Sequence, residues 1–138
     1  SLALAVGMLG GEMRVVSPIS QKFSEVDADR IAAAGITFAW SDRVEELVPG
    51  SDVIYNDTWI SMGEEDIREQ KLREFEGLQV TTDMLQLAPD AIFMHCLPAH
   101  RGEEVTDAVL DGPQSRIWPQ AANRLSSARG VLHFLATQ

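Results

Sequence analysis

Residues 91–102 read Ala-Ile-Phe-Met-His-Cys-Leu-Pro-Ala-His-Arg-Gly, an apolar run followed directly by reactive side chains. The first four residues have the length and character of a buried strand. Pro98 lacks the N–H that continued strand pairing requires. In α/β folds, ligands bind beyond the carboxyl ends of the strands. The position of His95 and Cys96 directly after this strand therefore favours a role in binding or chemistry.

Segments typical of short strands alternate with segments typical of helices along the whole chain. We expect strands at 13–16, 36–40, 53–55, 92–94 and 116–118, and helices at 2–9, 24–34, 42–48, 64–75, 82–87, 103–110 and from 119 onward. Strands separated by helices require crossover connections, which favour parallel pairing. The sequence thus predicts an α/β fold, a Rossmann-like parallel sheet with helices on both faces. Because a helical segment comes first, we expect this sheet to lack its first strand.

Composition excludes several classes of function. The chain has 138 residues, enough for one domain, and a net charge of −10 without a basic stripe, so we expect no nucleic-acid partner. No apolar run approaches the roughly 18 residues of a membrane-spanning helix, so we expect no membrane association. The single cysteine cannot form an internal disulfide, which suits a cytoplasmic location.

The segment 57–63, Asp-Thr-Trp-Ile-Ser-Met-Gly, follows the strand expected at 53–55. It places the carboxylate of Asp57 near Ser61, just before a helix expected to start near Glu64. Unpaired N–H groups at a helix start suit a carboxylate ligand, and Asp57 suits an ammonium. Together they would hold an amino acid by both charged ends. The alternative is that Ser61 is an ordinary helix cap and Asp57 a turn residue.

The adjacent pair His95 and Cys96 allows a tuned thiol, a nucleophile or a metal ligand. Neighbouring strand residues point to opposite faces, which argues against a nucleophile–base pair between these two. A structural metal is disfavoured because no second cysteine exists and the other histidines lack ligand spacing. A buried, unreactive cysteine is the alternative.

Arg124 lies in the first turns of the expected terminal helix. Its planar guanidinium could bind an oxyanion or a carbonyl oxygen. A surface arginine without a ligand is the alternative.

Taken together, three segments resemble the carboxyl-terminal, ornithine-binding half of the ornithine carbamoyltransferase family. They are 57–63, the stretch 95–105 (His-Cys-Leu-Pro-Ala-His-Arg-Gly-Glu-Glu-Val) and 123–125 (Asn-Arg-Leu). Their order and separations fit, and the resemblance covers essentially all of residues 1–138. It implies transfer of a carbamoyl group from carbamoyl phosphate to the δ-amino group of L-ornithine, giving L-citrulline and phosphate, without a metal or organic cofactor.

The resemblance also implies roles for individual residues. Asp57, Ser61 and Met62 would bind the α-amino and carboxylate groups of ornithine, and Cys96 would lie near the δ-amino group. The carbonyl of Leu97 and the side chain of Arg124 would contact carbamoyl phosphate. His95 is placed among the substrate-binding residues. The catalytic residues implied are Cys96 and Arg124.

Some features of the family are not in this sequence. The family's phosphate loop and carbamoyl-phosphate-binding domain do not occur, so we expect this chain alone to be inactive or nearly so. The family is typically trimeric, so a homo-oligomer is expected of the whole protein. Two alternatives stay open: a sibling carbamoyltransferase for putrescine or an N-acylated ornithine, and a non-catalytic amino-acid-binding or assembly domain.

Overall fold

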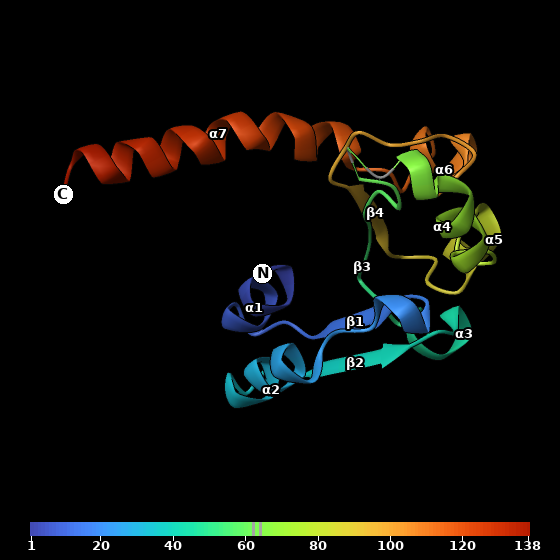
Figure 1. Cartoon of the computed structure of the whole chain (residues 1–138). Coiled ribbons are helices and arrows are strands. Elements are labelled where there is room, and N and C mark those ends of the chain that lie inside the picture. The colour runs from blue at the N-terminus through green and yellow to red at the C-terminus, as the bar shows by residue number, and fades with distance from the viewer. Residues whose placement is uncertain (62, 64) are drawn as a thin grey trace.

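Helices and short strands alternate along the chain (Figure 1). The computed structural model describes residues 1–61, 63 and 65–138. Its elements are α1 (Leu2–Met8), β1 (Met13–Val16), η1 (Ile19–Gln21), α2 (Glu25–Ala33), β2 (Phe38–Ser41), α3 (Val44–Leu47), β3 (Val53–Asn56), η2 (Glu65–Ile67), α4 (Arg68–Glu74), α5 (Thr82–Gln86), β4 (Ile92–His95), α6 (Asp107–Leu110) and α7 (Ile117–Ala136). The predicted α/β class is confirmed.

The strands pair in parallel, as predicted, in two ladders. β1 pairs with β2, with Met13 opposite Phe38. β3 pairs with β4, from Val53 opposite Ile92 to Asn56 opposite His95. Within the described residues no strand pairing joins one ladder to the other. The predicted sheet is therefore divided between β1 and β3.

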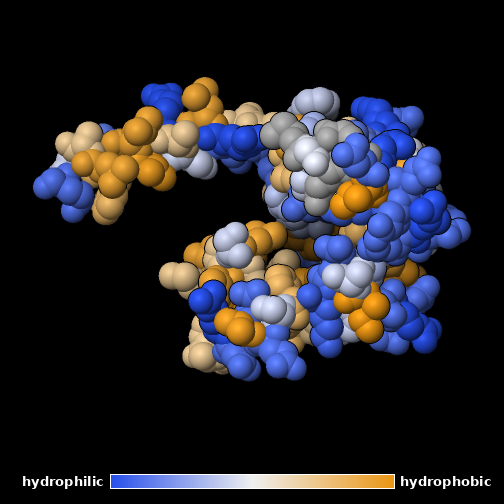
Figure 2. Space-filling model, viewed as in Figure 1, coloured by the Kyte–Doolittle hydropathy of each residue, from blue (hydrophilic) through white to orange (hydrophobic). Residues whose placement is uncertain are grey.

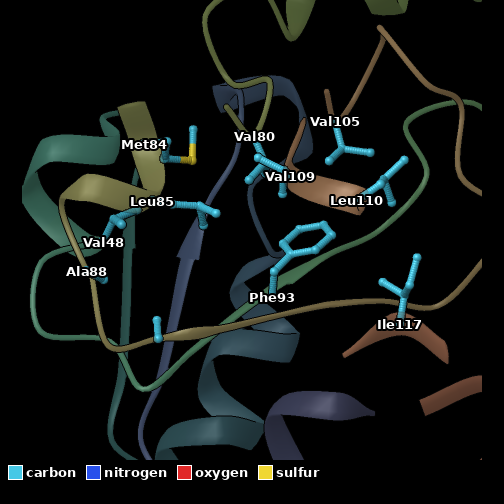
Figure 3. Close-up of a cluster of buried hydrophobic side chains, with 11 residues drawn as sticks. Val48, Val80, Met84, Leu85, Ala88, Phe93, Val105, Val109, Leu110 and Ile117 are labelled. Atoms are coloured by element: carbon cyan, nitrogen blue, oxygen red, sulfur yellow. The ribbon is translucent and has the colours of Figure 1, made fainter. Parts of the chain in front are cut away.

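The core is built around β4. Phe93 is completely buried, and residues from α5, α6 and the start of α7 surround it (Figure 3). The cluster comprises Val48, Val80, Met84, Leu85, Ala88, Ala91, Phe93, Val105, Val109, Leu110 and Ile117. Because alternate strand residues share a face, His95 is buried on the same side as Phe93. Packing of Phe93 thus fixes the orientation of the first residue of the predicted site.

Two helix starts follow from local hydrogen bonds. The hydroxyl of Ser24 accepts the N–H of Asp27 at 3.2 Å and caps α2, which lies within the helix expected at 24–34. The hydroxyl of Thr81 accepts the N–H of Met84 at 3.2 Å and caps α5. The helix expected at 82–87 thus spans Thr82–Gln86 and has its cap one residue earlier. The cap is the residue whose backbone is still extended.

The strand predicted at 116–118 is wrong. Next to the predicted strand, Ser115 forms an isolated bridge to Phe93 of β4. The N–H of Arg116 donates to the carbonyl of Phe93 at 2.8 Å. Helix α7 then begins at Ile117, two residues before the predicted start. Pro119 lies in its first turn, where N–H groups have no partner within the helix.

Two predicted helices are shorter than expected. The segment 64–75 contains the 3₁₀ turn η2, and a regular helix begins only at Arg68. The segment 103–110 is helical only over α6, because Val105 bridges to Val80 and Arg101 instead. In the second segment the bridges of Val105 shorten the helix that the sequence pattern predicted.

Helix α7 extends away from the rest of the chain (Figure 1). Its apolar side chains lie on the surface in the space-filling view (Figure 2), and Leu125 and Leu132 are each 67% exposed. Among the described residues, no helix is both long enough and apolar enough to span a membrane.

Two glycine-to-alanine substitutions should change stability in opposite directions. A Cβ at Gly7 would lie 2.2 Å from Cγ1 of Ile36, whereas nothing lies within 4 Å of a Cβ at Gly130 in α7. We expect Gly7→Ala to lower the free energy of unfolding by about 1–3 kcal/mol through overpacking. Gly130→Ala should raise it by about 0.5–1 kcal/mol, because alanine favours a helix. Urea unfolding measures both, and a Gly7→Ala protein as stable as wild type would contradict the packing of α1.

Candidate functional site

The carboxyl ends of β3 and β4 lie side by side, because Asn56 and His95 are the last partners of that ladder. Asp57 directly follows β3, and Cys96 directly follows β4. The thiol of Cys96 donates to Oδ1 of Asp57 at 2.8 Å, and the N–H of Thr58 donates to the same oxygen at 2.8 Å. The segment that begins at Asp57 and the segment that contains Cys96 therefore meet at this edge.

The Cys96 thiol is held in its neutral form. Burial raises its pKa above the ordinary value, and the hydrogen bond to the Asp57 carboxylate raises that pKa further. The thiolate is the nucleophilic form of cysteine, so this environment disfavours covalent catalysis. At neutral pH the side chain is instead a hydrogen-bonding group beside a carboxylate.

His95 lies beneath this pair and is only 1% exposed. Its Nδ1 accepts the N–H of Leu97 at 2.9 Å and lies 3.9 Å from Sγ of Cys96. An unprotonated Nδ1 leaves the ring proton on Nε2. The backbone N–H of His95 donates to Oε1 of Gln120 at 2.9 Å, which ties α7 to the end of β4. His95 therefore holds the turn after Cys96 in place.

Glu104, which sequence reasoning missed, is the buried partner of His95. Its side chain is fully buried, and Oε1 lies 3.4 Å from Nε2 of His95. Burial alone would raise the pKa of this carboxyl, but contacts from His95 and the N–H of His100 outweigh burial and lower it. Only the adjacent acidic pair 103–104 marks this position in the sequence, and nothing there shows which carboxylate turns inward.

Further contacts join the two loops of the site. Nδ2 of Asn56 donates to the backbone carbonyl of Glu104 at 2.9 Å, and the Thr58 hydroxyl lies 3.2 Å from Nδ1 of His100. His100, Glu103 and Glu104 each bring one ligand-type atom within 4.8 Å of the others. Arg68 already pairs with Glu103 and the N–H of His100 with Glu104, so we assign no metal ion there.

The helix start that was expected to bind a carboxylate lies further along the chain than predicted. Ser61 is exposed and precedes η2, whereas the regular helix α4 starts at Arg68 and has Ile67 at its cap position. The α-helix expected to start near Glu64 therefore starts at Arg68, and Ser61 does not cap it. The binding of a carboxylate by Ser61 stays a prediction. Met62 lies outside the described residues.

The turn that follows Cys96 has an unusual backbone. Leu97 has a φ of 57°, in the left-handed region that non-glycine residues rarely adopt, and its peptide bond to Pro98 is cis. The Leu97 N–H donates a hydrogen bond to Nδ1 of His95. The hydrogen bond to His95 therefore helps to stabilise a backbone conformation that leucine rarely adopts.

Arg124 is exposed on α7 and has no carboxylate partner within the described part of the chain. Its charge acts on Tyr55, a β3 residue missed by sequence reasoning. Burial raises the pKa of Tyr55, and the nearby Cys96 and Asp57 raise it further, while Gln120 and Arg124 oppose this. Tyr55 thus links the electrostatics of Arg124 to the thiol and its carboxylate, although no direct contact joins them.

Removing the Asp57 charge should make Cys96 more reactive. Because Asp57 raises the pKa of the thiol, Asp57→Asn should move the pH midpoint of alkylation by iodoacetamide to lower pH. Alkylation below the midpoint should then be faster, because a larger fraction of the side chain is thiolate. Asp90→Asn, an exposed substitution on another loop, is the matched control. An unchanged midpoint in Asp57→Asn would show that the hydrogen bond between Asp57 and Cys96 does not control the thiol.

Known proteins resemble this chain over its whole length. An ornithine carbamoyltransferase described as catabolic, from Halobacterium salinarum, is 45% identical over 139 aligned residues, which cover 100% of this chain and 46% of the relative. The crystal structure of anabolic ornithine carbamoyltransferase from Campylobacter jejuni superimposes with a TM-score of 0.91 at 32% identity, covering 100% of this chain and 47% of that one. An N-acetyl-L-ornithine transcarbamylase structure is more distant, with a TM-score of 0.70 at 26% identity over 91% of this chain and 40% of its own.

The chain thus spans less than half the length of these relatives. A sequence model of the aspartate/ornithine carbamoyltransferase Asp/Orn binding domain matches residues 1–135, nearly the full chain. On this match, and on the parallel strand ends described above, the chain belongs to the aspartate/ornithine carbamoyltransferase family and corresponds to its Asp/Orn-binding domain.

Proposed function

We propose that residues 1–138 form the ornithine-binding part of an enzyme that carbamoylates L-ornithine with carbamoyl phosphate. The products are L-citrulline and phosphate. The observation that carries this proposal is the pairing of Cys96 with Asp57, at 2.8 Å, at the carboxyl ends of adjacent parallel strands. A carboxylate and a neutral hydrogen-bonding group at this edge suit a substrate with two amino groups, one of them charged and one reactive.

The reacting nitrogen must be neutral, because a protonated amine has no lone pair. The δ-nitrogen attacks the carbamoyl carbon, a C–N bond forms, and the carbonyl electron pair moves onto oxygen. Collapse of this intermediate breaks the bond to the phosphate oxygen, and phosphate leaves with that electron pair and takes up the proton lost by nitrogen. A neutral Cys96 favours this course because it adds no negative charge that would hold a proton on the amine.

The remaining residues take roles around this step. Asp57 binds the α-ammonium group, and the segment of Ser61 and Met62 receives the α-carboxylate. The Leu97 carbonyl orients the carbamoyl group, and the Arg124 guanidinium stabilises the developing oxyanion. His95 acts through the turn it holds, because its ring is buried against Glu104. Aligning two small substrates can itself supply about 7–11 kcal/mol of rate enhancement.

The whole protein needs more than these residues. We propose that the carbamoyl-phosphate-binding domain is separate from residues 1–138, and that the complete enzyme is a cytoplasmic homo-oligomer, with a trimer the expected form. No metal or organic cofactor is required for the chemistry above. Putrescine and N-acylated ornithine are weaker substrate candidates. Putrescine offers no carboxylate to Ser61, and an N-acyl group would remove the ammonium that Asp57 binds.

Joining this chain to the amino-terminal half of the Halobacterium salinarum relative should give a protein that forms citrulline, whereas this chain alone should form none. In the joined protein, Asp57→Asn should raise KM for ornithine roughly tenfold or more, because a charged hydrogen bond is lost. Cys96→Ser should lower kcat roughly a hundredfold at similar KM. Steady-state kinetics with ornithine, putrescine and N-acetylornithine measures these effects and the substrate preference together.

The exposed substitution Asp90→Asn serves as the control and should change neither constant. Calorimetry distinguishes the enzyme from a non-catalytic amino-acid-binding domain. If the chain alone binds ornithine tightly without carbamoyl phosphate, and the folded joined protein forms no citrulline, the catalytic proposal is wrong.

A further inference from the structure

Helix α7 contacts the strands near its beginning. Ile117 is buried in the core, and Oε1 of Gln120 accepts the backbone N–H of His95 at 2.9 Å. From Ala122 to Gln138 every residue is exposed, and the helix extends away from the rest of the chain (Figure 1). Among the described residues, no side chain of α7 beyond Gln120 is hydrogen-bonded to a strand. The contact of Gln120 therefore controls how the exposed part of α7 is oriented.

Arg124 lies one helical turn after Gln120. Side chains four residues apart lie on the same face of an α-helix. The rise between them is about 6 Å, four residues at 1.5 Å each. The rotation of α7 that brings Gln120 to the end of β4 thus also sets the direction in which Arg124 leaves the helix.

Gln120 and Arg124 act on the same strand residue. Tyr55 lies at the end of β3, two residues before Asp57. Burial and neighbouring negative groups raise the pKa of Tyr55, whereas hydrogen bonding by Gln120 and the charge of Arg124 lower it. The carbonyl end of the Gln120 amide faces His95, which leaves the NH₂ end for the Tyr55 hydroxyl. One glutamine therefore connects the ends of both strands to the helix that carries Arg124.

We propose that Gln120 is a positioning residue for Arg124. By accepting the N–H of His95, it sets the rotation of α7 and directs the Arg124 guanidinium toward the strand ends that carry Asp57 and Cys96. Gln120 acts through Arg124 and not on the substrates. The effect on catalysis rests on the proposed function, because that proposal gives Arg124 its role at the oxyanion. The orientation of α7 does not depend on it.

A purely structural role for Gln120 makes different predictions. The glutamine would then only satisfy the backbone donor of His95 and stabilise the chain. Its loss would lower activity by the same factor whether or not Arg124 is present, because effects of independent sites add. A generally loosened site would also weaken the binding of ornithine, which the proposed function assigns to Asp57 and Ser61.

A double-mutant cycle in the joined protein separates the two roles. Gln120→Met keeps the side-chain length and helix propensity but removes the acceptor for His95. It should lower kcat roughly tenfold or more at similar KM for ornithine, because misplacing a group by about 1 Å can cost a hundredfold. In an Arg124→Met background the same change should lower kcat less than about twofold. Gln86→Met, an exposed substitution in α5, is the matched control and should leave kcat unchanged.

A second measurement uses residues 1–138 alone. Tyr55 is the only tyrosine of the chain, so ¹³C labelling of tyrosine gives a single Cζ signal in the NMR spectrum. At neutral pH, Arg124→Met should shift this signal in the otherwise wild-type chain. With Gln120→Met already present, the shift should fall to less than about half. Gln120→Asn keeps the amide but shortens its reach, and it replaces Gln120→Met in both experiments if that variant does not fold.

Three outcomes would overturn the assignment of Gln120. They are an equal loss of kcat with and without Arg124, a KM for ornithine that rises as much as kcat falls, and a Tyr55 signal that responds equally, or not at all, to Arg124→Met in the two backgrounds. If the joined wild-type protein forms no citrulline, the proposed reaction is wrong. The Tyr55 signal then still decides whether Gln120 sets the position of Arg124.

Discussion

The carboxylate of Glu104 is fully buried below the site and faces the ring of His95, which is itself 1% exposed. Burying a charge is costly unless hydrogen bonds and an opposite dipole or charge compensate. Here the compensation comes from the N–H of His100 and from Nε2 of His95. The loop after β4 can therefore not move without uncovering a charge. The positions of Cys96 and Leu97 depend on this buried contact, although neither touches Glu104.

Above the buried contact of Glu104 with His95, the site carries the polar pair Asp57 and Cys96. Asp57 and Cys96 are brought together by the register of β3 and β4, and burial together with the Asp57 carboxylate raises the pKa of the Cys96 thiol. The charge of Arg124 acts on Tyr55 from α7, whose first turns are tied to β4 through Gln120. The Asp57 carboxylate accepts hydrogen bonds from Cys96 and Thr58, whereas Arg124 has no carboxylate partner among the described residues.

The sequence predicted the parts of this structure that depend on local chemistry. Alternating apolar segments indicated parallel strands, and the polar residues after 53–55 and 92–94 indicated a shared edge, because parallel strands end on the same side. The sequence could not indicate that Glu104 rather than Glu103 turns inward, since that choice depends on where His95 lies. It also predicted too long a helix over 103–110 and a strand at 116–118, because the patterns there do not show the bridges of Val105 to Val80 and of Ser115 to Phe93.

The protonation of the His95 ring tests the central claim most directly. If Glu104 fixes His95, and His95 holds the turn at Leu97, the ring must carry its proton on Nε2 and accept the Leu97 N–H at Nδ1. The ¹⁵N chemical shifts of His95 at neutral pH should therefore show a neutral ring with a protonated Nε2. A proton on Nδ1, in either the neutral or the charged ring, would contradict the account, because the Leu97 N–H would then have no acceptor.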